Sequence, residues 1–276
     1  MFMTTRTLLL AASALMVTAG AAHAAPALGV AGGTALFNFD TAAPGITTGL
    51  RNISGLAGGE ALFGIDYRPA TNVLYGLGTA GRLYTINTTT GTATLAATLS
   101  VSPSGTTFDI AFNPVVDRLR IVSDTGQNLR ANVADGVTIA DGSVDAAAGI
   151  IGVAYINQFA GATSTVLYDI GGASSPDTLF IQNPPNSGTL TMPRSTGVDG
   201  LASFDIDGAT NLGYAASNSA FYTLDLASGA AALVGGFGRS DVTDFTIVPT
   251  AVPEPMSLAL LGMGLLGLAA ARRRAV

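Results

Sequence analysis

The feature of this 276-residue chain that most constrains its fold is a repeat of about 45 residues. One recurring hairpin starts with an aromatic or aliphatic strand, crosses a polar turn that usually contains glycine, and enters a second short strand. Its copies start at Leu36, Leu83, Leu129, Leu179 and Phe221, at spacings of 47, 46, 50 and 42 residues. A second strand-like element recurs at 64–69, 109–114, 152–157, 203–207 and 244–249, and a third lies between the two at 72–77, 117–122, 164–169 and 211–215.

Four short strands per repeat match one blade of a β-propeller. The repeats start on a hairpin at 36–56 and end on the second element at 244–249, so strands from both termini can complete the last blade and hide its edges. We therefore expect an all-β fold, a five-bladed β-propeller over 34–250, preceded by a flexible lead-in at 25–33. A β-sandwich or an open stack of repeats is the alternative.

The N-terminal segment has the three parts of a secretory signal peptide. Arg6 supplies a positive start, an apolar run covers 8–17, and Ala22 and Ala24 place small residues at the two recognised cleavage positions. The apolar run is shorter than the roughly 20 residues that a spanning helix needs. We expect signal peptidase to remove residues 1–24.

The C-terminal segment, residues 252–276, is more specific. Val252, Pro253, Glu254 and Pro255 form the motif V-P-E-P, an apolar run follows at 256–271, and then come Arg272, Arg273 and Arg274. The arginines favour the cytoplasmic side, so the body faces outward. This order resembles the PEP-CTERM sorting signal of Gram-negative, exopolysaccharide-producing bacteria. The resemblance implies transient insertion into the inner membrane, cleavage by an exosortase, and release to the cell surface or extracellular matrix. A permanent tail anchor is the alternative.

The body between these ends is strongly acidic. The whole chain has a net charge of −6, and without Arg6, Glu254 and the three C-terminal arginines the body keeps eight Arg against 17 acids, a net of −9. Such a charge does not favour nucleic acid or anionic lipid as a partner. The chain also lacks Cys and Lys, and its one His, His23, lies in the signal peptide. Thiol, Schiff-base and imidazole chemistry are therefore excluded from the mature body.

Three runs in the body carry a second resemblance, namely 59–69, 82–87 and 182–190. They are similar to an uncharacterised bacterial family, the domain of unknown function 4394, and the resemblance covers roughly 34–249. It implies a β-propeller and supplies no catalytic residues.

The second strand element suggests where chemistry lies. Alternate residues of a strand share a face, and one face of this element is apolar in every repeat while the other is small or acidic. If this strand is innermost, four carboxylates cluster around the channel: Asp66, Asp109, Asp205 and Asp244. Such a cluster must bind a cation such as Ca²⁺, take up protons, or accept hydrogen bonds from backbone N–H groups. A pair of them acting as glycosidase acid and base is a further hypothesis.

Other polar segments favour structural interpretations. Asp135, Asp141 and Asp145 lie in a Gly-rich loop without EF-hand spacing, which predicts a solvated loop. Arg68 and Arg120 are expected to neutralise nearby carboxylates. The run 183–186, with two prolines between asparagines, predicts a rigid turn that could belong to a binding rim.

These observations lead to one functional expectation and one alternative. We expect an exported surface or matrix propeller that acts as a non-catalytic binding or structural module, with exopolysaccharide or surface proteins as partners. The alternative is a secreted carbohydrate-active enzyme that uses the aspartates of the inner strands.

Overall fold

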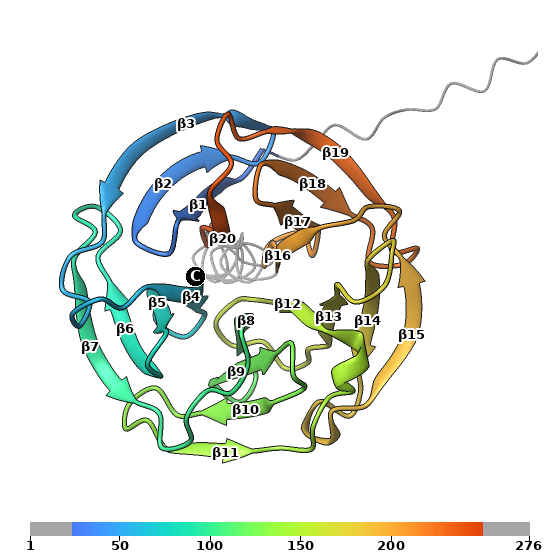
Figure 1. Cartoon of the computed structure of the whole chain (residues 1–276), viewed down its shortest axis with the longest axis horizontal. Helices are drawn as coiled ribbons and strands as arrows, with labels where there is room; N and C mark the ends of the chain where they lie inside the picture. Colours follow the sequence, from blue (N-terminus) through green and yellow to red (C-terminus); the bar gives the residue numbers. More distant parts are fainter. Residues whose placement is uncertain (1–23, 251–276) are drawn as a thin grey trace, which may run out of the picture.

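The computed structural model describes residues 24–250 and shows a five-bladed β-propeller in which five four-stranded sheets surround one axis (Figure 1). In four blades the strands form an antiparallel meander whose first strand in sequence lies nearest the axis, and in the remaining sheet β20 (Val242–Ile247) takes that innermost place. The fold class predicted from the repeats is confirmed. Within residues 24–250, no helix is long and apolar enough to cross a membrane.

The strands have the following bounds, from the axis outward in each blade. The closing blade consists of β20 (Val242–Ile247), β1 (Pro26–Ala31), β2 (Ala35–Asp40) and β3 (Ala43–Asn52). The second blade consists of β4 (Leu62–Arg68), β5 (Val73–Gly78), β6 (Arg82–Ile86) and β7 (Ala93–Thr98). The third blade consists of β8 (Phe108–Asn113), β9 (Arg118–Ser123), β10 (Asn128–Ala131) and β11 (Thr138–Ala140). The fourth blade consists of β12 (Ile150–Tyr155), β13 (Leu167–Gly171), β14 (Thr178–Gln182) and β15 (Leu190–Ser195). The fifth blade consists of β16 (Leu201–Ile206), β17 (Gly213–Ser217), β18 (Ala220–Leu224) and β19 (Ala231–Gly236). Two short 3₁₀ turns cover Ala146–Ala148 and Pro185–Ser187.

The closing blade joins the two ends of the described chain. Strand β20 pairs antiparallel with β1, with Ala27 opposite Ile247 and Gly29 opposite Phe245. Closure by both termini is therefore confirmed. The expected lead-in at 25–33 needs correction, because β1 lies within it and supplies the second strand of this blade. The propeller thus begins at residue 26, inside the segment expected to precede it.

Each inner strand uses its two faces differently. The apolar face packs against the preceding blade, as Ile110 and Phe112 of β8 do against Tyr75, Leu77 and Leu83. The small or acidic face turns toward the inner strand of the following blade, and neighbouring inner strands contact one another all round the ring. Small side chains on that face allow this close approach.

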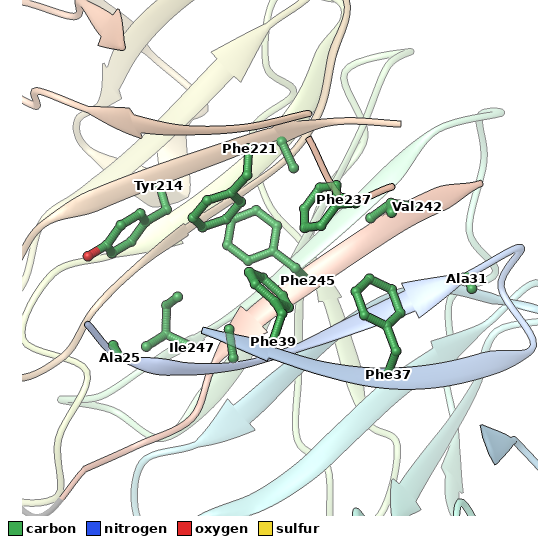
Figure 2. Close-up of a cluster of buried hydrophobic side chains, with 12 residues drawn as sticks. Ala25, Ala31, Phe37, Phe39, Tyr214, Phe221, Phe237, Val242, Phe245 and Ile247 are labelled. Carbon is green, nitrogen blue, oxygen red and sulfur yellow. The ribbon is translucent and has the colours of Figure 1, made fainter. Parts of the chain in front are cut away.

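The largest aromatic cluster seals the closing blade against the fifth (Figure 2). The ring centroid of Phe245 on β20 lies 5.1 Å from that of Phe221, and the ring centroid of Phe39 lies 5.2 Å from those of Phe221 and Phe237. All three pairs have edge-to-face geometry. Such pairs contribute roughly 0.5–1.5 kcal/mol each beyond the area they bury. The cluster therefore stabilises the junction at which the ring closes.

Candidate functional site

The four predicted aspartates are all buried on inner strands, in two layers along the axis. Asp109 and Asp244 occupy one register position, and Asp66 and Asp205 occupy the position two residues further along their strands. None of the four is more than 8% exposed. The structure therefore brings them to the axis as expected, and it also shows what their oxygens contact.

Each carboxylate accepts a hydrogen bond from the backbone of the next inner strand. The donors are Phe112 N to Asp66 (2.6 Å), Val153 N to Asp109 (2.7 Å), Ile247 N to Asp205 (2.7 Å) and Ile65 N to Asp244 (2.6 Å). We call these four contacts the carboxylate clasps. They connect neighbouring inner strands, namely β4 to β8, β8 to β12, β16 to β20 and β20 to β4.

The junction of β12 with β16 has no clasp, because β12 carries Gly152 and Ala154 at the two positions where each of the other inner strands carries one aspartate. Here the strands pack directly. A Cβ on Gly152 would lie 2.7 Å from Cβ of Phe204, closer than real contacts of this kind. The fifth junction thus uses backbone proximity in place of a carboxylate.

Hydroxyl groups add to the clasps on the β16–β20 side. Thr246 donates to Asp205 at 3.0 Å and reaches Asp66 at 3.5 Å, so it lies between the two carboxylates of its layer. Ser203 donates to Asp244 and accepts from the backbone N–H of Phe245 at 3.2 Å. Within the described part of the chain, no three acidic or His side chains converge so as to hold a metal ion.

Burial dominates the protonation of this cluster. It raises the pKa of Asp205 to about 6 and that of Asp244 to about 7, against hydrogen bonds that act to lower them. Burial also raises the pKa values of Asp66 and Asp109 well above the ordinary range, and repulsion from Asp205 and Asp244, respectively, adds to this. Neutral pH therefore leaves part of the cluster protonated.

The cavities at the two ends of the propeller axis differ in size. At the ends of the inner strands, Asp66, Gln158 and Asp205 border a hollow of about 20 Å³, room for about one water molecule. At the starts of the inner strands lies a cavity of about 350 Å³, which we call the wide mouth. Its lining is apolar or neutral: Leu62, Phe63, Thr106, Thr107, Phe108, Ile151, Leu201, Ala202, Asn218 and Thr243.

A third cavity, about 370 Å³, lies between the third and fourth blades and has a different chemistry. We call it the arginine groove; its lining is Asn113, Val116, Arg118, Arg120, Arg130, Tyr155, Pro185 and Asn186. Arg120 pairs with a carboxylate as expected, since its Nη1 donates to Asp141 at 2.7 Å. The sequence pattern does not indicate that three of the eight body arginines share one cavity.

The loop carrying Asp135, Asp141 and Asp145 is only partly the solvated segment that was predicted. Asp135 and Asp145 are exposed and accept backbone hydrogen bonds within local turns. The side chain of Asp141, however, is 5% exposed and pairs with both Arg120 and Arg130. Burial acts to raise its pKa, but these hydrogen bonds outweigh burial and the pKa lies below the usual value. Arg68 pairs with Asp117, as its expected role requires.

One buried carboxyl was missed. Asp169 on β13 is fully buried and neither of its oxygens has a hydrogen-bond partner. Burial raises its pKa to about 8, although the charge of Arg120 acts to lower it. The available signal is its place in the strand expected at 164–169, where alternation alone does not show which face it occupies.

The remaining predicted positions concern processing. Ala24 is the first described residue and is exposed. Ala22, the motif at Val252–Pro255 and the arginines at 272–274 lie outside the described residues.

Two family models match the chain. One, described as a domain of unknown function (DUF4394), matches residues 35–246, and the other, the PEP-CTERM protein-sorting motif, matches residues 251–274. Both resemblances noted from the sequence are thereby confirmed, and with them export of the protein and processing by an exosortase. No curated protein matches the sequence.

Several solved structures resemble the fold at low identity. A gluconolactonase from Xanthomonas campestris has 15% identity and a TM-score of 0.43, with 75% of this chain and 73% of that one covered. A chain in a nidogen/laminin complex has 11% identity and a TM-score of 0.48, with 82% and 98% covered. The computationally designed Ika8 protein has 10% identity and a TM-score of 0.37, with 71% and 57% covered. With TM-scores under 0.5, none of them indicates a ligand or an activity for this chain.

Proposed function

This chain belongs to the DUF4394 family, and we propose that it is a non-catalytic binding module that works at the cell surface or in the extracellular matrix. One observation carries the proposal: every axial carboxylate accepts a backbone N–H of the neighbouring blade. The hydrogen bonds of these carboxylates hold neighbouring blades together. We therefore assign ligand binding to the cavities at the surface of the propeller.

The wide mouth is the cavity best placed for a ligand, because it lies on the propeller axis and is of a size that accommodates small molecules. Phe63 is half-buried there, and its ring centroid lies 4.4 Å from that of Phe108. Thr106 and Asn218 are exposed on the rim and can exchange hydrogen bonds with hydroxyl groups. An apolar floor with neutral polar groups matches an uncharged saccharide.

A panel of neutral glycans tests this site on the processed protein. Phe63→Leu keeps an apolar side chain but removes the ring, and we expect it to weaken binding severalfold. Leu95→Ala on the outer strand β7, where Leu95 is 54% exposed, serves as the matched control and should bind normally. Equal binding by both variants, or no binding to any neutral glycan, would contradict a ligand site at the wide mouth.

Surface or matrix placement requires its own experiment. Pro253→Ala combined with Pro255→Ala alters the sorting motif without touching the propeller. We expect the unaltered protein in the surface or medium fraction, shortened near residue 252, and the variant retained at full C-terminal length in the membrane fraction. Unaltered protein found only in the periplasm would refute the proposed location.

An enzymatic function is the second candidate, and it rests on one observation. Asp109 Oδ1 and Asp244 Oδ2 each lie 3.3 Å from where a Cβ of residue 64 would be, so at most twice that distance separates them. The pKa of Asp244, about 7, suits a general acid. Glycan cleavage abolished by Asp244→Asn and by Asp109→Asn would support this candidate. An absence of turnover over a broad glycan panel would refute it.

A further inference from the structure

The arginine groove concentrates positive charge on an acidic protein. Arg118, Arg120 and Arg130 line it, and no Asp or Glu does. Arg120 and Arg130 face each other across the β9–β10 pair and share Asp141, which neutralises only one of the two charges. Arg118 is exposed, and its neighbour Asp117 is already paired with Arg68. The groove therefore keeps a local excess of positive charge.

The buried carboxyl of Asp169 does not cancel this excess. Its charged form would attract Arg120, but burial raises its pKa to about 8, so at neutral pH it is mostly protonated. Asp169 thus leaves the guanidinium groups uncompensated, and an anion from solution can supply the missing charge.

The groove presents donors to a ligand. Arg130 spends Nε and Nη2 on Asp141, which leaves both N–H groups of Nη1 without a partner among residues 24–250. Asn113 and Asn186 each use Oδ1 as an acceptor, from Val115 N and from Arg120 Nη2, and so leave their Nδ2 groups to donate. A donor-rich wall selects a ligand rich in oxygen acceptors.

The groove is also rigidly built. Arg120 is 1% exposed, and it is held by Asn128 at 2.7 Å, Asp141 at 2.7 Å and Asn186 at 2.8 Å. Asn186 belongs to the turn after β14, whose Pro185 also lines the cavity. Donors fixed by packing lose little entropy on binding.

From these contacts we propose that the arginine groove binds a sugar acid, that is, a polyhydroxylated ligand with one carboxylate. The carboxylate lies against Arg118, whose planar fork matches its two oxygens, and against Nη1 of Arg130. The hydroxyl groups lie against Asn113, Asn186 and Tyr155. The volume, about 370 Å³, suits a ligand of this size. The site is distinct from the wide mouth and does not depend on what binds there.

Calorimetric titration of the processed protein tests the proposal with galacturonate, galactose and inorganic sulfate as probes. We expect galacturonate to bind with a dissociation constant of about 1 mM or tighter, and galactose and sulfate to bind at least about tenfold more weakly. Arg118→Gln should weaken galacturonate about tenfold, and Arg118→Lys should do so in part, since it keeps the charge but loses the fork. Arg194→Gln on β15, outside the groove, is the matched control and should bind as the unaltered protein does.

Four outcomes would overturn the proposal: no galacturonate binding, equal binding of galactose, equal binding of sulfate, and equal loss in Arg118→Gln and Arg194→Gln. Equal binding of sulfate would identify a simple anion site. Phe63→Leu separates this site from the wide mouth, because it should leave galacturonate binding unchanged. The folded state of each variant is checked by its far-UV circular dichroism.

Discussion

Replacing Asp244 isolates the energetic role of one carboxylate clasp. Its Oδ2 accepts from Ile65 N at 2.6 Å and its Oδ1 accepts from Ser203. Asp244→Ala leaves two buried donors without an acceptor, each at a cost of about 1–3 kcal/mol. Asp244→Asn keeps an oxygen for Ile65 and turns an NH₂ group toward the Ser203 oxygen, so near pH 5 we expect it to lie within about 1 kcal/mol of the unaltered protein.

The variant Asp244→Asn also tests how the free energy of unfolding depends on pH. The folded-state pKa of Asp244 is raised to about 7, above the ordinary value of 3.8, so the folded state binds more protons than the unfolded state between these values. Its stabilising contribution is therefore complete at low pH and is lost as the pH rises through 7. One proton corresponds to about 1.4 kcal/mol per pH unit, so between pH 5 and pH 8 the loss from Asp244 alone is roughly 3 kcal/mol.

Urea unfolding at several pH values measures this, with far-UV circular dichroism as the signal because the chain has no tryptophan. We expect the unfolding free energy of the unaltered protein to fall from pH 5 to pH 8, and that of Asp244→Asn to fall less steeply. The salt-bridged Asp117, Asp141 and Asp241 have lowered pKa values and stay ionised throughout this window, so they add no slope. A flat or rising curve for the unaltered protein, or equal slopes for both, would refute the reasoning.

Three further predictions concern the same ring. Asp169→Asn should flatten the stability curve between pH 6 and pH 9, because the pKa of Asp169 is raised to about 8; an unchanged slope in urea unfolding would contradict this. Gly152→Ala should cost about 1–3 kcal/mol in thermal or urea unfolding, since its Cβ would meet Phe204, whereas Gly58→Ala, with open space around it, should cost well under 1 kcal/mol. Adding calcium or a calcium chelator should change the melting temperature by less than about 1 °C, because the axial carboxylate oxygens already accept hydrogen bonds from backbone N–H groups. A calcium-dependent rise of several degrees that Asp66→Asn removes would show a cation site instead.

The repeat made the architecture predictable, because each copy had to contribute the same strands and the blade count followed from the copies. Strand β1 is not apparent from the sequence, because Pro26, Gly29 and two alanines give it little strand propensity. The structure explains one of these residues: a Cβ on Gly29 would lie 2.1 Å from Cζ of Phe37, so the glycine makes room for that ring. The packing of β1 within the blade, and not its local strand propensity, therefore makes this segment a strand.

The candidate site was predictable only in part. The alternation of residues along the inner strands predicts that four aspartates lie together, namely Asp66, Asp109, Asp205 and Asp244. This prediction needs only the two-residue period of a strand. It could not show that each carboxylate faces the next blade. The arginine groove could not be predicted from the sequence. Arg120 and Asn186 are 66 residues apart and come into contact only across the junction of two blades.

Ring closure has a consequence for the order of assembly. The ladder between β1 and β20 pairs Ala27 with Ile247, so the last described strand completes the blade that the first one begins. A chain that emerges N-terminus first during export can form the second to fifth blades while the closing blade still lacks its innermost strand. Until β20 arrives, Asp244 cannot clasp β4, and the aromatic cluster around Phe245 stays open to solvent. The sorting segment starts only four residues after β20, so translocation of the propeller is nearly complete when its ring can shut.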